Sequence, residues 1–159
     1  MSVLLAGIGN VFAGDDGFGV SVAAALARRT LPPGVRAGDY GIRGVHLAYE
    51  LLDGCDGLVL VDAVPMGEPA GTVCVIEPEP PGADAPPVDA HRMTPDLVLT
   101  TLARLGGSLE RVLVVGCQPA SLGPGLGLSP VVAAAVEPAA ALAVELAAEI
   151  LRAHEEALP

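Results

Sequence analysis

The feature that most constrains the fold is an uninterrupted apolar run at 58–61 (Leu-Val-Leu-Val). It follows Gly57, ends at Asp62 and shows no alternation of apolar and polar residues. A strand of this kind is covered on both faces, as in a parallel sheet that lies between two layers of helices. Similar apolar strands are expected at 3–7 and 111–116. The sequence therefore predicts a three-layer α/β/α sandwich.

Helix and strand patterns alternate along the rest of the chain. Weaker strands are expected at 35–40 and 72–77, and helices at 18–30, 45–52, 95–105 and 131–154. Only residues 63–71 separate the strand at 72–77 from its predecessor. That connection is too short for a helical crossover, so the strand should run antiparallel or lie at the sheet edge. We predict a five-stranded, mostly parallel sheet with one antiparallel strand, in a single domain that spans residues 1–159.

The composition favours a soluble protein without a nucleic-acid partner. The formal net charge of −11 opposes binding to a phosphate backbone. No leader pattern precedes the first strand, and the apolar segment at 131–151 carries Glu137, Glu145 and Glu149, which would be costly inside a membrane. Three cysteines without a Cys-x-x-Cys spacing indicate reduced thiols. We therefore expect a cytoplasmic protein that binds no membrane. We also expect a monomer, because no spare apolar face is patterned in the sequence.

Acidic residues follow three of the predicted strands. Ligands of parallel sheets bind beyond the carboxyl ends of the strands, so side chains at those ends are the first candidates for a site. They are Asp15 and Asp16 after the first strand, Asp39 after the second and Asp62 after the third. Because these ends meet at one edge of the sheet, we expect the acids to share one rim.

One interpretation of this rim is a dinucleotide site. A Gly-x-Gly pattern at 7–9 follows the first strand, and Asp39 ends the second, as such a site requires. Phe12, however, occupies the place of the third glycine. The two adjacent acids would also repel a pyrophosphate at the entrance of the first helix. We therefore do not favour this interpretation.

A second interpretation is a metal site that joins Asp16, Asp62 and His91, a histidine in the proline-rich segment at 78–95. Two carboxylates and one imidazole suit a borderline divalent ion such as nickel, zinc or manganese. Each residue also has a structural explanation. One of the two adjacent acids can cap the first helix, Asp62 can accept hydrogen bonds from loop amides, and His91 can be an exposed loop residue. Their joint position on one rim favours the metal site.

Several short motifs occur together in a fixed order along the chain. They are Gly-Ile-Gly-Asn at 7–10, Gly-Asp-Asp-Gly-Phe-Gly-Val at 14–20, Asp-Tyr-Gly-Ile-Arg-Gly at 39–44, Val-Asp-Ala at 61–63, His91 and Gly-Leu-Ser at 127–129. In this combination the chain resembles the hydrogenase maturation proteases over nearly its whole length. One departure is that many members carry Glu at the position of Asp16.

The resemblance implies a metal-dependent endopeptidase that removes the C-terminal extension of a nickel–iron hydrogenase large-subunit precursor after nickel insertion. It implies Asp16, Asp62 and His91 as metal contacts and Asp39 as a further functional acid. We therefore expect Asp16 and Asp39 to serve catalysis, Asp39 either as a general base or as a loop organiser. The nickel would arrive with the precursor, and another divalent ion is an option in vitro. The same ligands would also suit a non-catalytic nickel-binding checkpoint protein that holds the precursor.

Overall fold

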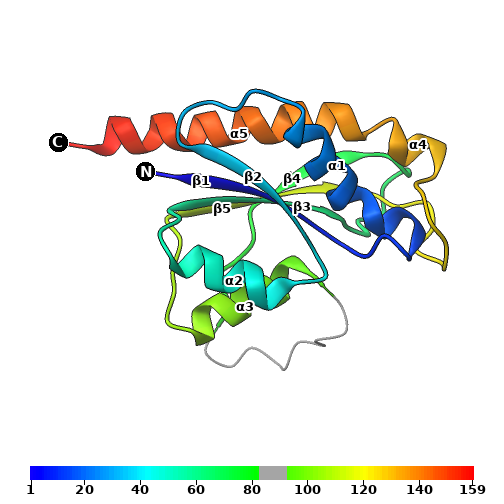
Figure 1. Cartoon of the computed structure of the whole chain (residues 1–159), viewed down its shortest axis with the longest axis horizontal. Coiled ribbons are helices and arrows are strands. Elements are labelled where there is room, and N and C mark those ends of the chain that lie inside the picture. Colours follow the sequence, from blue (N-terminus) through cyan, green and yellow to red (C-terminus); the bar gives the residue numbers. More distant parts are fainter. Residues whose placement is uncertain (83–92) are drawn as a thin grey trace.

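The structure, a computed structural model, describes residues 1–82 and 93–159. Its centre is a five-stranded sheet in the order β2-β1-β3-β5-β4 (Figure 1). The strands are β1 (Val3–Ile8), β2 (Val35–Gly41), β3 (Gly57–Ala63), β4 (Val73–Ile76) and β5 (Arg111–Cys117). β1, β2, β3 and β5 run parallel, and β4 pairs antiparallel with β5 at the edge. The predicted sheet, with its one antiparallel strand, is confirmed.

Helices cover both faces of the sheet. Figure 1 shows α1 and α5 on one face and α2 and α3 on the other, in agreement with the contacts between these pairs. The helical segments are η1 (Gly14–Gly17), α1 (Phe18–Ala27), α2 (Gly44–Leu52), α3 (Pro95–Arg104), α4 (Pro130–Ala133) and α5 (Val136–Ala157). The predicted three-layer α/β/α architecture is therefore confirmed.

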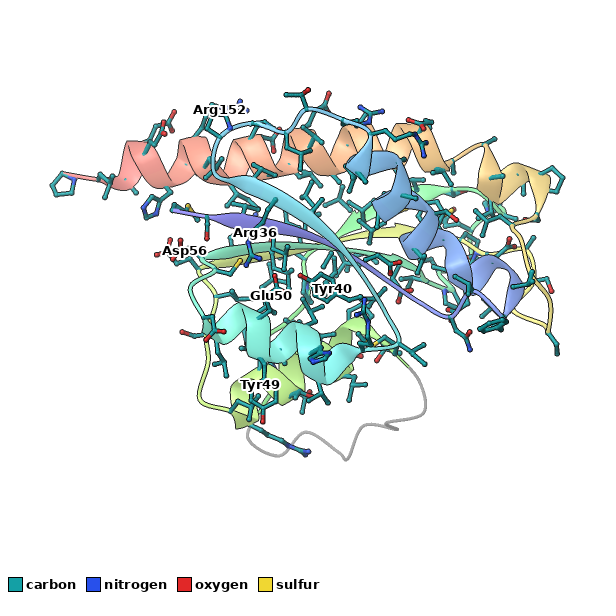
Figure 2. The ribbon with its side chains drawn as sticks, in the orientation of Figure 1. Arg36, Tyr40, Tyr49, Glu50, Asp56 and Arg152 are labelled. Carbon is teal, nitrogen blue, oxygen red and sulfur yellow. The ribbon has the colours of Figure 1, made fainter. Side chains whose placement is uncertain are left out.

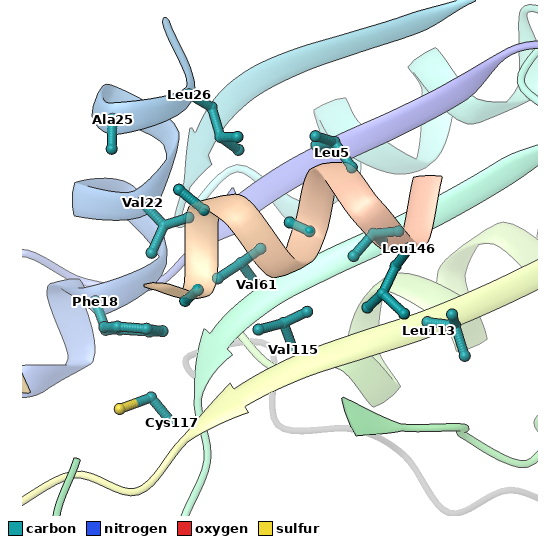
Figure 3. Close-up of a cluster of buried hydrophobic side chains, with 14 of the residues drawn as sticks. Leu5, Phe18, Val22, Ala25, Leu26, Val61, Leu113, Val115, Cys117 and Leu146 are labelled. Atoms are coloured by element: carbon teal, nitrogen blue, oxygen red, sulfur yellow. The ribbon is translucent and has the colours of Figure 1, made fainter. Parts of the chain in front are cut away.

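The side chains of the central strands alternate between two apolar cores. In β3, Val59 and Val61 pack with α1 and α5, whereas Leu58 and Leu60 pack with α2 and α3. Figure 3 shows the first of these cores, between α1, α5 and the sheet. Burial on both faces explains why β3 has no polar alternation. The period of two also directs Asp62 toward the same face as Leu60, the face that α2 and α3 cover.

The last helical segment is interrupted near its start. α4 ends at Ala133 and α5 begins at Val136, so the bend lies just before Pro138 in the first turn of α5, where proline is tolerated. By length and composition the stretch from α4 through α5 could cross a membrane. Its inner face is instead buried against α1 and the sheet, which is how the core helix of a globular domain packs. The buried residues of α5 are Ala139, Ala140, Ala143, Leu146, Ala147 and Ile150.

Two loops at the carboxyl end of the sheet are joined by the side chain of Asp15, which is 1% exposed. The carboxylate accepts hydrogen bonds from the backbone N–H groups of Ala120 (2.8 Å), Ser121 (3.0 Å) and Ser129 (2.7 Å) and from the Ser129 hydroxyl (2.9 Å). Burial alone would raise the pKa of Asp15, but these hydrogen bonds outweigh it and hold the pKa below its ordinary value. The loop after β1 is thereby fixed to the loop between β5 and α4.

A second polar contact fixes α2 to β2 (Figure 2). The Tyr40 hydroxyl donates to Glu50 Oε2 at 2.6 Å, and Arg36 forms an ion pair with the same carboxylate. The hydrogen bond from Tyr40 is the main reason that the pKa of Glu50 lies below its ordinary value. Burial and the Glu50 carboxylate together raise the pKa of Tyr40. The contact therefore keeps Glu50 ionised and Tyr40 neutral.

We expect Asp15→Asn to lower the free energy of unfolding by roughly 3 kcal/mol, because an amide NH₂ would meet donors where the carboxylate accepts. The pKa of Asp15 is lowered by folding, so its contribution is present above its unfolded pKa and is lost as the pH falls through the folded pKa. Urea unfolding at neutral and acid pH measures both effects. Asp53→Asn, at an exposed acid after α2, is the control and should change stability by less than about 0.5 kcal/mol. Equal stability of Asp15→Asn and the parent at neutral pH would contradict the role of Asp15.

We expect Tyr40→Phe to lower the free energy of unfolding by about 1 kcal/mol at neutral pH, because it removes one hydrogen bond to a partly exposed carboxylate. The pKa of Glu50 is depressed in the folded state, so the difference should be full above 4.5, the ordinary pKa, and vanish as the pH falls through the folded pKa. Thermal unfolding at several pH values tests this. Tyr49→Phe is the matched control, since Tyr49 lies on α2 but is 53% exposed. A loss of the same size at acid pH would mean that packing, and not the hydrogen bond, is responsible.

Candidate functional site

Asp16 lies in η1, at the entrance to α1. Its Oδ2 accepts a hydrogen bond from the backbone N–H of Asn10 at 2.9 Å, which ties the acid to the end of β1. The residue before α1 is Gly17, and no side chain caps the helix. The interpretation of Asp15 or Asp16 as a helix cap is therefore wrong, since Asp15 binds the loop before α4 and Asp16 remains at the rim of the sheet.

Asp62 is the second carboxylate of this rim, near the end of β3. It is 3% exposed, and its Oδ1 has no hydrogen-bond partner in the described part of the chain. Burial, together with the neighbouring charge of Asp16, holds the pKa of Asp62 well above its ordinary value. The fold does little to stabilise the ionised form of Asp62, because the backbone N–H of Ala63 is the one group that opposes the upward shift of its pKa. Such a group is a candidate functional residue.

Glycines allow the two acids to approach each other. Gly9 has φ +137, and a Cβ there would lie 1.9 Å from the backbone oxygen of Asp16 and 3.7 Å from Asp62 Oδ1. A side chain at position 9 would therefore separate the strand ends that carry the acids. A Cβ on Gly19 would likewise lie 2.2 Å from the carbonyl oxygen of Val61. Without these glycines α1 could not pack so closely against the ends of β1 and β3.

Asp16 and Asp62 line one cavity of about 300 Å³ at the carboxyl end of the sheet. The cavity lies beyond β1 and β3, at the end of the sheet where β1 leads into η1 and α1 and where β3 leads to the edge strand β4. Its acids are surrounded mostly by apolar groups, with two polar neighbours, Asn10 and Thr94. The apolar lining consists of Ala13, Ile42, Ala63, Pro65, Met93 and Leu122. Two carboxylates between apolar walls form an acidic pocket that would bind a cation or a polarised group.

Asp39 lies beside this cavity but does not line it. It is exposed at the end of β2, and its Oδ1 accepts a hydrogen bond from the backbone N–H of Gly41 at 2.9 Å. Arg43 donates to the backbone carbonyl oxygen of Asp39 at 2.6 Å, so the arginine contacts the main chain of this turn. In the described structure the Asp39 carboxylate therefore contacts the turn between β2 and α2.

His91, the third predicted ligand, lies outside the described residues. Within residues 1–82 and 93–159 no three His, Cys, Asp or Glu side chains are grouped as a metal site. Cys117 is unsuited to act as a nucleophile, because it is fully buried and burial with the nearby charge of Asp15 raises the pKa of its thiol to about 11. The structure therefore brings together Asp16 and Asp62 from the predicted set and leaves Asp39 at the margin.

The pair fits a divalent cation. Each acid offers carboxylate oxygen, which is a ligand for such ions, and Asp62 Oδ1 has no competing donor in the described part of the chain. A cation between the two would also oppose the effects of burial and of the Asp16 charge, which together raise the pKa of Asp62. It would supply electrophilic activation of a bound carbonyl or water.

The sequence did not point to the apolar wall of the cavity. Ile42 and Leu122 belong to loops rich in glycine and proline, where no periodic pattern marks a residue as inward or outward. An apolar side chain in such a loop is not buried by a neighbouring helix or strand of its own segment. This is the one sequence feature that could have suggested that Ile42 and Leu122 line a site. Both side chains lie at the site because β2 and β5 run in the same direction, so the loops that follow these strands leave from the same end of the sheet.

Comparisons with known proteins identify relatives of this chain. A family model described as hydrogenase maturation protease matches residues 20–146. The hydrogenase 2 maturation protease of Escherichia coli is 32% identical over 142 residues, which span 87% of this chain and 86% of that protein. The hydrogenase expression/formation protein HupM of Azotobacter chroococcum is 36% identical over 152 residues, 93% of this chain and 72% of that protein.

Solved structures show the same likeness. The hydrogenase maturating endopeptidase HybD from Escherichia coli superposes with a TM-score of 0.76 at 29% identity, and the match covers 94% of this chain and 93% of that one. The NiFe hydrogenase maturation protease HycI from Thermococcus kodakarensis gives a TM-score of 0.64 at 29% identity, covering 95% and 92%. On this evidence the chain belongs to the hydrogenase maturation protease family, and is a hydrolase of the endopeptidase class.

Proposed function

We propose that this protein is an endopeptidase that removes the C-terminal extension of a nickel–iron hydrogenase large-subunit precursor after nickel insertion. The observation that carries the proposal is the buried Asp62 carboxylate, which shares one cavity with Asp16 and has no hydrogen-bond donor for Oδ1 in the described part of the chain. A protein loses stability by keeping two acids in this arrangement, so a positively charged substrate group is the best explanation for it.

The nickel in this proposal belongs to the substrate. Asp16 and Asp62 would contact the ion that the precursor carries, and the family resemblance adds His91 as a third ligand. Binding of the ion would place the adjoining peptide segment against the apolar wall of the cavity. The bond to be cut would then be held in one position, which lowers the entropic cost of the reaction.

Hydrolysis requires a proton acceptor for the attacking water. In this proposal an oxygen of the acid pair takes the proton and gives it to the nitrogen of the departing amine as the carbon–nitrogen bond breaks. The hydrogen bond between Asp39 and Gly41 supports the loop-organising role for Asp39 over the role of general base. We further propose that the protein acts as a monomer in the cytoplasm, where large-subunit precursors would be available before assembly.

The alternative of a non-catalytic checkpoint protein uses the same acids. The comparisons favour the endopeptidase, because the relatives with the same fold are called proteases and endopeptidases. The two functions differ in one measurable product, the released C-terminal peptide.

We expect Asp16→Asn to lower the rate of processing by at least about 100-fold. The loss of one charge would remove a metal contact and weaken the positioning of the substrate. Mass spectrometry of nickel-loaded precursor incubated with the purified protein measures the released peptide. Asp16→Glu is the matched control and should retain processing, since it keeps the carboxylate. Asp39→Asn should also retain processing if that acid only organises its turn.

Release of the peptide at the parental rate by Asp16→Asn would overturn the assignment of Asp16. A precursor that binds the parent protein tightly and stays intact would favour the checkpoint protein.

We expect Asp62→Asn to be more stable than the parent in the presence of a chelator, by on the order of 1–2 kcal/mol at neutral pH. The pKa of Asp62 is raised by folding, so the folded parent binds a proton that the unfolded chain has lost. The parent therefore loses stability as the pH rises from the ordinary pKa to the raised one, and the advantage of the variant grows over that window. Urea unfolding from pH 5 to pH 9 measures the difference, and the variant should be inactive throughout. A variant less stable than the parent at every pH would show that Asp62 stabilises the fold.

A further inference from the structure

The most exposed large apolar side chains of the described chain lie at one end of the molecule. They are Leu126 (75% exposed), Ile42 (69%) and Phe12 (68%). Ile42 lines the cavity of Asp16 and Asp62 together with Leu122, which is 43% exposed. Phe12 and Leu126 are joined to the same cavity through Ala13, which lines it and pairs with Gly125. We call Phe12, Ile42, Leu122 and Leu126 the apolar collar.

Backbone hydrogen bonds hold Phe12 in its exposed position. Its N–H donates to Asn10 Oδ1 at 2.9 Å, and its carbonyl oxygen accepts from the N–H of Gly125 at 2.9 Å. The N–H of Gly14 donates in turn to the carbonyl oxygen of Gly125 at 2.9 Å. Because both main-chain groups of Phe12 are bonded, the aromatic ring projects from a fixed backbone and loses little entropy on contact with a partner.

Leu126 is presented in the same way from the facing loop. It lies between Gly125 and Gly127, whose φ angles of 147° and 91° few other residues would adopt. The bridge between Ala13 and Gly125 aligns this turn with the loop after β1, and Figure 1 shows the loop after β1 beside the loop before α4. Asp15 ties both loops together beneath the surface. The backbone that carries Phe12 and Leu126 is therefore preformed.

The two phenylalanines of the chain differ in burial, and Phe12 is not part of the core. Phe18 is fully buried against α5 and the sheet (Figure 3), whereas Phe12, six positions earlier, faces solvent. Large apolar groups that gather on a surface mark a contact with a partner. Aromatic residues are also enriched at protein interfaces relative to the rest of the surface.

The charges around the collar restrict the partner. Segments 7–20 and 118–130 contain no Lys or Arg, and their only charged residues are Asp15 and Asp16. Arg43, which follows Ile42, is a basic residue next to the collar, and its guanidinium donates to the backbone carbonyl oxygen of Asp39. One arginine provides little of the basic surface that an anionic membrane or a nucleic acid requires. The surface suits an apolar protein face that surrounds a cationic centre, so that the centre meets Asp16 and Asp62 while the apolar face meets the collar.

We propose that the apolar collar docks onto a folded, apolar surface of the precursor next to its metal-bearing segment, and so selects the folded precursor over a free tail peptide. This inference rests on the function proposed above. The collar provides affinity, and the acid pair contacts the ion. Substrate recognition thus has two separable parts, one apolar and insensitive to salt, the other electrostatic.

The test compares steady-state cleavage of nickel-loaded precursor by the parent and by the double variant Phe12→Ser/Leu126→Ser. We expect KM to rise at least about tenfold while kcat changes less than about twofold, since the variant loses docking and keeps the acid pair. The melting temperature should be unchanged, because both side chains are exposed in the free protein. Leu158→Ser is the matched control, as Leu158 is 60% exposed at the other end of the molecule and should leave KM unchanged.

The outcomes separate this inference from the proposed function. If the parent cleaves the precursor and the double variant has the same KM, the docking role of the collar is overturned. The proposed protease function is unaffected by that result. A kcat that falls with unchanged KM also overturns it, because the collar would then act in the chemical step. If the parent binds phosphatidylcholine vesicles and the double variant does not, the collar is a lipid-binding surface and the docking proposal is overturned. A parent that neither binds nor cleaves the precursor overturns both proposals.

Discussion

The arrangement of the site depends on the buried Asp15 carboxylate. Four hydrogen bonds from the loop between β5 and α4 converge on it, and no other buried acid in the described chain is satisfied so fully. They fix the loop after β1, which carries Asp16 toward the cavity. A charged hydrogen-bond acceptor is well suited to this task, because it compensates several backbone donors that a loop cannot satisfy through regular secondary structure.

Asp16 and Asp62 have the opposite energetic character. They repel each other, Asp62 is buried with an oxygen that has no donor in the described residues, and its pKa is raised as a result. The fold holds them together because Gly9 and Gly19 let α1 pack closely against β1 and β3, and because two apolar cores hold those strands from both faces. Stability from the cores and from Asp15 therefore maintains a local arrangement that is unfavourable in the free protein.

Much of the fold could be predicted from the sequence, because uninterrupted strands such as the one at 58–61 admit few architectures. The short connection before β4 likewise fixed the antiparallel edge. The site could be predicted only in part. Asp15 and Asp16 are adjacent and chemically identical, and only the course of the loop before α4, which depends on distant residues, decides that one is an anchor and the other faces the cavity. Asp39 lies near the end of its strand as predicted, but it is exposed and accepts a hydrogen bond from Gly41, and it does not line the cavity.

The apolar collar and the acid pair at this end of the molecule would contribute differently to the recognition of a partner. A metal ion bound by carboxylates provides specificity for a charged centre, but many proteins and free ions carry such a centre. Apolar contacts provide affinity for a protein surface, but they discriminate poorly among surfaces. Phe12, Asp16 and Leu126 are carried by two loops that hydrogen bonds join to each other, so a partner that contacts both the collar and Asp16 would have to fit them in a fixed geometry. A protease with this arrangement would be protected from cutting a precursor whose metal is absent, and from binding metal ions that no precursor carries.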